Sequence, residues 1–252
     1  IPMVPIRRAV LTRAIDEREA CFNATACGRG CSIGAAFQTT TSVIPWAKKT
    51  GNLKIVTDAM VKEVHLGDDG KTTGVTFVNR KTKGDVRVDA DFVILAASAC
   101  ETARLMLNSK SDKFPGGIAN SSGQVGRNLV DSTGADVSGH IPALKGRPRY
   151  NEDGLDGSHL YIPWWDYDGQ DDGSVNFKRG YHFEVGGGFG APSMGVGRSV
   201  DGYGKSAKQD VRDNYGSNIG FALRGEMVIS DDCYCEIDEQ VKDKWGIPVL
   251  KF

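Results

Sequence analysis

Three of the six cysteines in this 252-residue chain lie in one short, glycine-rich stretch, at Cys21, Cys27 and Cys31. Cysteine thiolates are soft ligands that bind zinc, copper(I) or iron–sulfur clusters. The nearby glycines permit a tight loop that aims three sulfur atoms at one point. Because no fourth cysteine is close, the C-x5-C-x3-C spacing favours a three-iron cluster over a tetrahedral site that needs four ligands.

Other interpretations of these cysteines stay open. They are a zinc site with a distant fourth ligand, a disulfide plus one thiol, or three small residues in a turn. Outside the loop, Cys100 is interpreted as a small buried hydrophobic residue. Cys233 and Cys235 alternate along an expected strand and point to opposite faces, so we expect them neither to bond to each other nor to chelate one metal.

The composition narrows the function classes. Basic and acidic side chains number 31 and 32, which indicates neither a nucleic-acid-binding surface nor a polybasic membrane surface. No apolar run is long enough for a transmembrane segment, and a hydrophobic content of 40% suffices for a core. The chain begins at Ile1 and ends in an apolar, strand-like segment, so we expect a fragment of a longer polypeptide.

The elements that must position any site are clearest between residues 52 and 109. Short alternating runs separated by Gly/Asp turns predict a β-meander over residues 52–57, 60–66, 74–78 and 86–88. The apolar run 92–97 predicts a strand buried on both faces in a parallel sheet, and a helix is expected over 101–108. Small residues after such a strand let a ligand approach its carboxyl end, or only let the helix pack closely on the sheet.

Residues 92–109 resemble the second signature of the glucose–methanol–choline (GMC) oxidoreductases, flavoproteins that oxidise alcohols and sugars. The matching residues are Ser98, Ala99, Thr102, Leu105, Met106 and Ser109, while Ala103 and Lys110 depart from the signature. Residues 52–66 resemble the family's strand pair in which a valine backbone contacts the adenine end of the flavin. The turn 123–131 is similar to the family's Gly-x-Val-Gly-x-Asn-Leu-x-Asp/His turn.

The resemblance implies FAD as cofactor and a mixed α/β fold. Part of a Rossmann-like FAD-binding domain with the β-meander and the cysteine loop is expected over 1–135. Part of an antiparallel-sheet substrate domain is expected over 136–225, and a return to the FAD-binding domain over 226–252. The cofactor-binding residues that the resemblance implies are Val61, Ala97, Ser98, Asn128 and Asp131.

The cysteine loop resembles the insertion of bacterial FAD-dependent sugar dehydrogenases that carries a 3Fe-4S cluster. This likeness implies that Cys21, Cys27 and Cys31 are the cluster ligands. It also implies oxidation of a sugar, polyol or sugar acid, with electrons passing through the cluster to a haem subunit or other acceptor. Such relatives work at the bacterial periplasmic membrane, which implies a periplasmic or membrane-associated complex.

No catalytic residue is assigned within these 252 residues. The family's histidine base lies near its C-terminus, and the four histidines here, His65, His140, His159 and His182, lack that context. His182 and the pair Trp164 and Trp165 could face or stack on a substrate, or could be structural. Two rival hypotheses are a GMC oxidase that uses oxygen without a cluster, and a zinc- or disulfide-stabilised binding module.

Overall fold

The computed structural model describes residues 2–22, 30–148, 159–163, 169, 172–177, 179–188, 200 and 202–252. The described chain is mixed α/β, which confirms the expected fold class. Its contacts divide it into two units: residues 1–53 with 132–226, and residues 54–131 with 227–252. The domain boundaries expected near residues 135 and 225 of the complete protein stay predictions.

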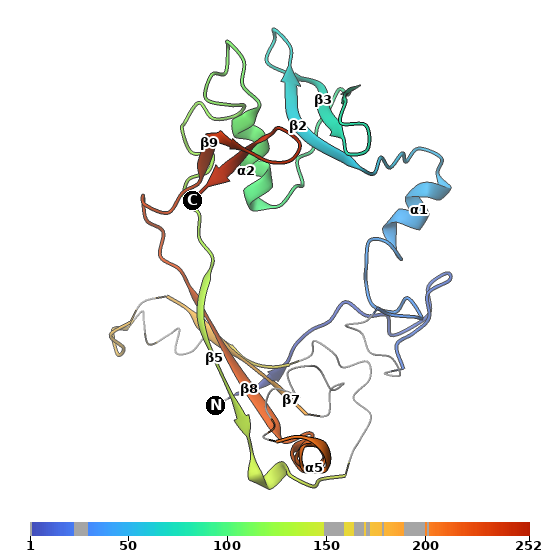
Figure 1. Ribbon diagram of the computed structural model, residues 1–252, viewed down its shortest axis with the longest axis vertical. Coiled ribbons are helices and arrows are strands. Elements are labelled where there is room, and N and C mark those ends of the chain that lie inside the picture. The colour runs from blue at the N-terminus through green and yellow to red at the C-terminus, as the bar shows by residue number, and fades with distance from the viewer. Residues whose placement is uncertain are drawn as a thin grey trace. The chain divides into compact units, whose positions relative to one another are not determined.

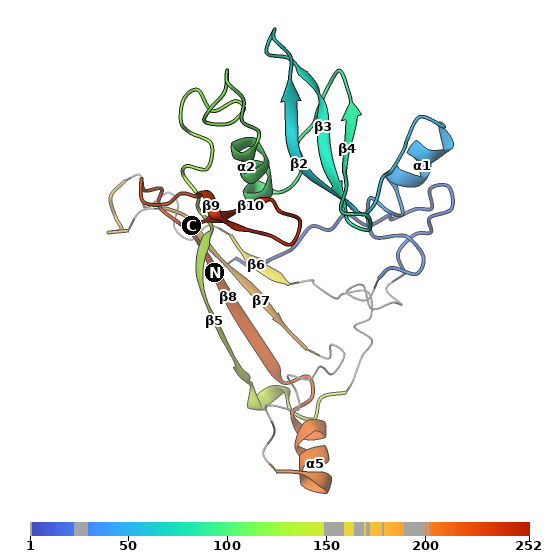
Figure 2. The ribbon, with the colours of Figure 1, turned by 45° about the horizontal axis from the view of Figure 1, so that its top comes forward.

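The second unit contains the meander. Strands β2 (Ala59–Leu66), β3 (Thr72–Asn79) and β4 (Asp85–Asp89) pair antiparallel in that order. Figure 2 shows the three strands side by side. The turns between them contain glycine, aspartate or asparagine, as the sequence pattern requires. The predicted strands at 60–66, 74–78 and 86–88 are therefore confirmed.

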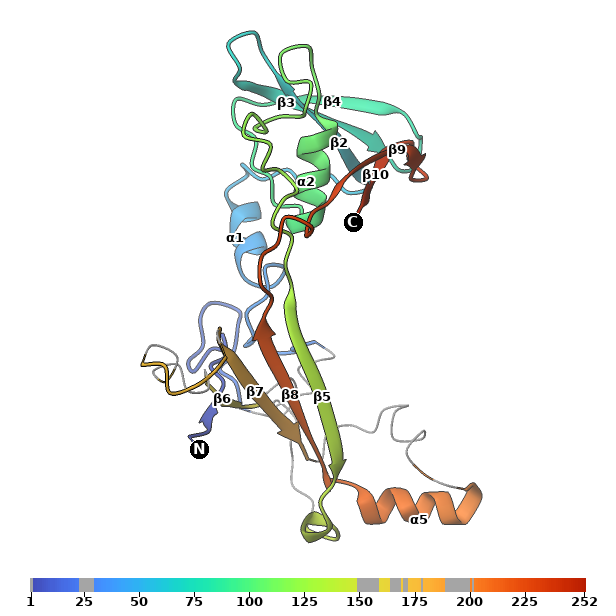
Figure 3. The same ribbon diagram turned by 90° about the vertical axis from the view of Figure 1, so that its left-hand side faces the viewer.

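Helix α2 (Ala99–Asn108) packs on β2 in this unit and confirms the expected helix. Val64 of β2, Leu105 of α2 and Ile118 form its buried apolar cluster. Strands β9 (Glu236–Lys242) and β10 (Pro248–Lys251) form an antiparallel hairpin that also contacts α2 (Figure 3). The expected strand near the end of the chain is thus present as β10.

Three details of the sequence interpretation are wrong. Residues 52–57 and 92–97 form no strand, and Phe92 and Ile94 are 89% and 90% exposed. A strand needs a neighbour for its backbone hydrogen bonds, and no described strand pairs with either segment. Cys233 and Cys235 precede β9 in an irregular segment, so the alternation argument does not apply to them.

The first unit contains a five-stranded antiparallel sheet (Figure 1). Its order is β1 (Val4–Pro5), β6 (Leu160–Ile162), β7 (Tyr181–Gly187), β8 (Asn218–Glu226) and β5 (Ser132–His140). The registers of β5, β6, β7 and β8 run without a shift, so residues opposite one another lie on one face of the sheet. An antiparallel sheet in this part of the chain agrees with the expected fold.

The described part of the first unit also contains two helices and one 3-10 turn. They are α1 (Val43–Lys49), the 3-10 turn η2 (Pro142–Leu144) and α5 (Gly204–Asn214). Trp164 and Trp165 lie outside the described residues. Within the described ranges, every helix is too short or too polar to cross a bilayer.

Candidate functional site

A pocket of about 360 Å³ lies in the second unit where β2 meets α2. Its wall is formed by Ala59, Met60, Val61 and Lys62 of β2, Ala97 before the helix, Glu101, Arg104, Leu105 and Asn108 of α2, and Ile247. Two of the residues expected to bind the cofactor, Val61 and Ala97, therefore line one cavity. Ser98, Asn128 and Asp131 are not part of its wall.

A sharp backbone turn places Ala97 at the pocket. Ser98 has a positive φ of 72°, which swings the chain from the extended segment into α2. The Ala97 N–H donates to Thr102 Oγ1 at 3.3 Å, and the Thr102 N–H donates to the Ser98 carbonyl at 2.9 Å. These bonds hold the turn. The side chain of Ala97 is small and therefore leaves space in the pocket.

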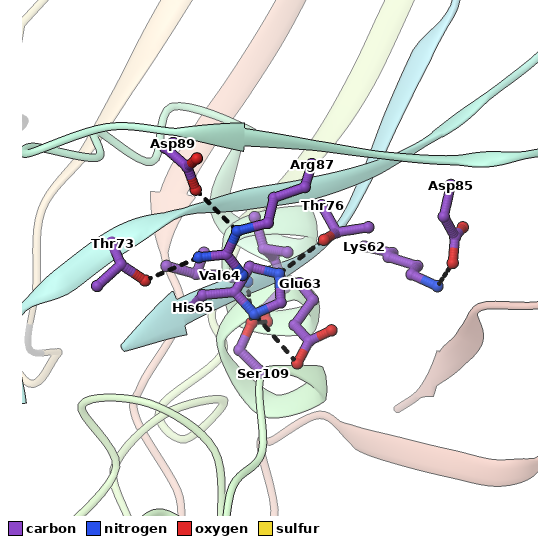
Figure 4. Close-up of polar contacts among 11 residues, drawn as sticks. Lys62, Glu63, Val64, His65, Thr73, Thr76, Asp85, Arg87, Asp89 and Ser109 are labelled. Atoms are coloured by element: carbon purple, nitrogen blue, oxygen red, sulfur yellow. Dashed lines mark hydrogen bonds and ion pairs between the residues drawn. The ribbon is translucent and has the colours of Figure 1, made fainter. Parts of the chain in front are cut away.

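Ser109 fixes the helix against the strand. Its hydroxyl accepts a hydrogen bond from the Val64 N–H at 2.8 Å and donates one to the Leu105 carbonyl at 2.7 Å. The side chain is only 2% exposed. Figure 4 shows this contact beside the bond between His65 and Thr76 on the meander. This hydroxyl therefore links β2 to the last turn of α2 beside the packed side chains of Val64 and Leu105.

A buried charge network closes the pocket wall. Arg104 donates to Asp243 Oδ2 at 2.7 Å, to the carbonyls of Pro248 and Ile247, and to Glu101 Oε2. Burial opposes ionisation of Asp243. The hydrogen bonds from Arg104 and the Ile247 N–H outweigh it, and the pKa of that carboxyl is lowered.

Sequence reasoning missed this network. Glu101 and Arg104, three positions apart on an expected helix, were its only local signal. The main partner, Asp243, lies 139 residues further along the chain. Nothing in the spacing of the sequence indicates that long-range contact.

The turn 123–131 is anchored to another part of the same unit. The Leu129 N–H donates to the Cys233 carbonyl, and the Cys235 N–H donates to the Gly126 carbonyl, both at 2.8 Å. Asn128 has a positive φ of 55° and an exposed side chain. The turn is therefore held by backbone hydrogen bonds, while cofactor contact by Asn128 and Asp131 stays a prediction.

Two of the three clustered cysteines are described, and both lie in the first unit. Cys31 Sγ accepts a hydrogen bond from the Ala36 N–H at 3.5 Å, and this bond above all lowers the pKa of the thiol. Cys21 is held by its N–H, which donates to the Leu11 carbonyl. Cys27 lies outside the described residues. Among the described residues, no group of three potential ligands is placed to hold a metal.

The residues of the pocket fit the flavin cofactor, whereas a cluster held by Cys21, Cys27 and Cys31 stays a prediction because Cys27 lies outside the described residues. The pocket offers the main chain of β2 and a small alanine, which suits a flat ring lying against a strand. At the loop, a cysteine with a lowered thiol pKa is the donor chemistry that an iron–sulfur cluster requires.

Comparison with known families assigns the chain to a class of oxidoreductases. The family model for GMC oxidoreductases matches residues 7–133, about half of the chain, so the chain belongs to this family.

Among individual proteins, the chain is 28% identical over 251 residues to the 2-methyl-1,2-propanediol dehydrogenase of Mycolicibacterium austroafricanum, covering 98% of this chain and 44% of that protein. It is 34% identical over 134 residues to the fructose dehydrogenase large subunit of Gluconobacter japonicus, covering 53% and 24%. It is 27% identical over 140 residues to the paromamine 6'-oxidase of Streptomyces fradiae, covering 55% and 26%. The chain therefore spans less than half the length of each of these relatives.

Proposed function

We propose that the protein containing this chain is an FAD-dependent dehydrogenase that oxidises a hydroxyl of a sugar, polyol or sugar acid. The observation that supports it most is the pocket that unites Val61 and Ala97, the two positions at which the family likeness implies contact with the flavin. Family membership supports the same cofactor. Two of the relatives are, by name, dehydrogenases of a diol and of fructose.

In this proposal the chain's residues bind and orient the cofactor. The β2 backbone around Val61 would hold the adenine end of FAD, and the small side chain of Ala97 would leave room for it. Arg104 and Asp243 keep α2 and the β9–β10 turn at a fixed separation. The FAD, when bound, supplies the hydride-accepting flavin ring, and no residue of this chain is proposed as the base that takes the hydroxyl proton.

A second part of the proposal concerns how electrons leave the flavin, and it involves the cysteine loop. We assign Cys21, Cys27 and Cys31 as ligands of a 3Fe-4S cluster, which when bound passes single electrons to a haem or other accepting subunit. The lowered thiol pKa at Cys31 supports a thiolate at this position. The name of the Gluconobacter relative, a large subunit, supports a partner subunit. The same proposal includes location of the complete protein in a periplasmic or membrane-associated complex.

A matched pair of variants tests the pocket. Val61→Trp fills the cavity, whereas Val86→Trp changes a valine on β4 whose exposure is nearly the same, 39% against 38%. Both valines lie opposite Phe77 in the meander, so their strand context is alike. We expect the complete protein to lose most of its FAD absorbance with Val61→Trp and to keep it with Val86→Trp. Equal FAD content in both variants would remove the pocket from the cofactor site.

A spectrum with metal analysis tests the electron route. The complete protein should show flavin bands that bleach on addition of sugars, together with about three irons per chain. Cys27→Ala should lower the iron content and leave FAD in place. Unchanged iron would refute that ligand assignment.

Two other outcomes of that measurement point to the rival functions. Flavin with hydrogen peroxide release and no iron would favour an oxidase, as the name of the Streptomyces relative suggests for that protein. Zinc without flavin would favour a binding module.

A further inference from the structure

The five-stranded sheet has two chemically different faces. Tyr161 lies opposite Glu184, and Glu184 opposite Ala222, so these residues share one face. That face carries the polar side chains of His159, Tyr161, His182, Glu184, Arg224 and Asp136, and we call it the polar face. The opposite face is apolar, with Phe183, Val185, Phe221 and Leu223.

Glu184 stands between two imidazoles on the polar face. His159 Nε2 and His182 Nε2 lie 3.8 Å and 3.5 Å from the same atom, Glu184 Oε1. A good hydrogen bond to oxygen is about 2.7–3.2 Å long, so both contacts are loose. An alcohol hydroxyl that approaches from the exposed side, next to both groups, donates to the carboxylate and accepts from an imidazole N–H, which uses both of its functions. The three side chains are 21–31% exposed and thus reachable.

An aromatic surface adjoins the carboxylate. The Tyr161 and His182 rings lie 4.6 Å apart between centroids. Sugars and polyols present C–H groups beside their hydroxyls, and such groups pack on aromatic rings. The cluster therefore offers both kinds of contact that a hydroxylated carbon chain makes.

Two glycines next to Glu184 leave the polar face without side chains at their positions, which gives a ligand space there. Gly186 and Gly220 lie opposite each other on β7 and β8, next to Glu184 in the strand order. A Cβ at Gly186 would meet nothing closer than 4.0 Å, and one at Gly220 nothing closer than 3.7 Å. Neither has a positive φ, so strand packing does not require glycine at either position. Gly187 differs, because a Cβ there would overlap the backbone of β8.

The charges of the polar face favour a neutral ligand. Arg224 pairs with Asp136 at 3.0 Å and is thereby compensated. Glu184 lies against the two histidines, and among the described residues no lysine or arginine pairs with it. Glu226 lies on the same face and pairs with Arg179 at 3.9 Å, so Glu184 is the one carboxylate of this face, within the described part of the chain, that has no arginine beside it. A carboxylate or phosphate on the ligand would be repelled.

We propose that the polar face binds two neighbouring hydroxyls of a neutral sugar or polyol, with Glu184 as the acceptor and His159 and His182 as donors. The proposal rests on the dehydrogenase function proposed above and narrows its substrate class, because it disfavours a sugar acid. It assigns these residues to binding of the substrate and not to the proton transfer of the reaction.

Three variants of the complete protein test this assignment. Glu184→Gln removes the charge and keeps the shape, and Gly220→Val fills the space that the glycine leaves on the face. Gly139→Val is the matched control, because Gly139 lies on β5 opposite Ile219 on the other face and also has free space for a side chain. The assays are steady-state oxidation of fructose, sorbitol, propane-1,2-diol and gluconate with a dye acceptor, FAD content, and thermal unfolding.

We expect Glu184→Gln and Gly220→Val to raise KM for the best neutral substrate about tenfold or more, with kcat changed much less. Both variants should have the same FAD content and unfolding temperature as the control Gly139→Val. The KM of the control should stay within about twofold of the KM of the wild type. Wild-type kcat/KM should be higher for a neutral compound than for gluconate.

The failing outcomes separate the two proposals. A protein that contains FAD and oxidises a neutral polyol, but whose KM is unchanged in both variants, keeps its function and overturns the binding face. Preference for gluconate overturns the charge argument and the proposal with it. A protein that contains no FAD, or oxidises nothing in the panel, overturns the dehydrogenase function and this inference together.

Discussion

Replacing Arg104 by methionine tests how the pocket wall is held. Arg104 is 9% exposed and donates to four acceptors, with the shortest bond, 2.7 Å, to Asp243 Oδ2. Arg104→Met keeps most of the side-chain volume and removes every one of these bonds. Asp243, with a side chain 20% exposed, then keeps only the N–H groups of Trp245 and Ile247 as donors.

The cost follows from the burial of the pair. Removing one partner of a buried ion pair costs about 3–5 kcal/mol, because the other charge is left uncompensated. Asp243 retains backbone donors and some contact with water, so we expect the lower end, about 3 kcal/mol. The pocket shares this residue, so FAD binding should weaken in the same variant.

The control is an arginine–aspartate pair of similar length at the surface. Arg87 contacts Asp89 at 2.8 Å, and their side chains are 48% and 80% exposed. Arg87→Met should cost about 0–1 kcal/mol, since water already screens that pair. In urea denaturation of the complete protein followed by tryptophan fluorescence, the Arg104 variant should unfold at a clearly lower concentration. Coincident curves for the two variants would refute the burial argument.

Three further results are expected. The pKa of Asp243 is lowered below its ordinary value of 3.8. Its contribution to the free energy of unfolding is therefore complete above about pH 4 and is lost as pH falls through the lower folded-state pKa. In urea denaturation curves at a series of pH values, the stability difference between wild type and Asp243→Asn should disappear on acidification. Ser109→Ala leaves a buried backbone N–H without its acceptor and should cost about 1–3 kcal/mol in the same assay. Gly126→Ala should destabilise far more than Gly123→Ala: both have positive φ, but only at Gly126 would a Cβ overlap the Cys235 carbonyl, and similar thermal shifts would contradict that clash.

The meander could be predicted because its signals are local. Alternation of apolar and polar residues with Gly/Asp turns defines strands at 60–66, 74–78 and 86–88 without reference to any distant segment. Residues 92–97 have the composition of a buried strand, yet a strand exists only where a neighbour accepts its hydrogen bonds. The composition of residues 92–97 therefore indicated a strand, but it gave no information on whether a neighbouring strand lies beside this segment.

The site was predictable only in part, for a similar reason. Val61 and Ala97 were found through the family likeness, and the packing of β2 on α2 brings them to one pocket. Arg104 and Asp243 were missed because their pairing spans most of the chain. Of the polar face, only His182 was considered from the sequence. The face as a whole was missed because its residues come from different strands, and only the register of β6 and β7 shows that Tyr161 and Glu184 are neighbours.

The charges around the pocket indicate which end of the cofactor it suits. Lys62 pairs with Asp85 at 2.5 Å, and Arg104 is compensated by Asp243 and Glu101. Within the described part of the chain, no cation of this wall is left without a carboxylate. A pyrophosphate carries two negative charges and would find no cation here that is not already paired. A wall of strand backbone, alanine and compensated charges suits an uncharged ring better, and this supports the proposal that Val61 lies at the adenine end of FAD.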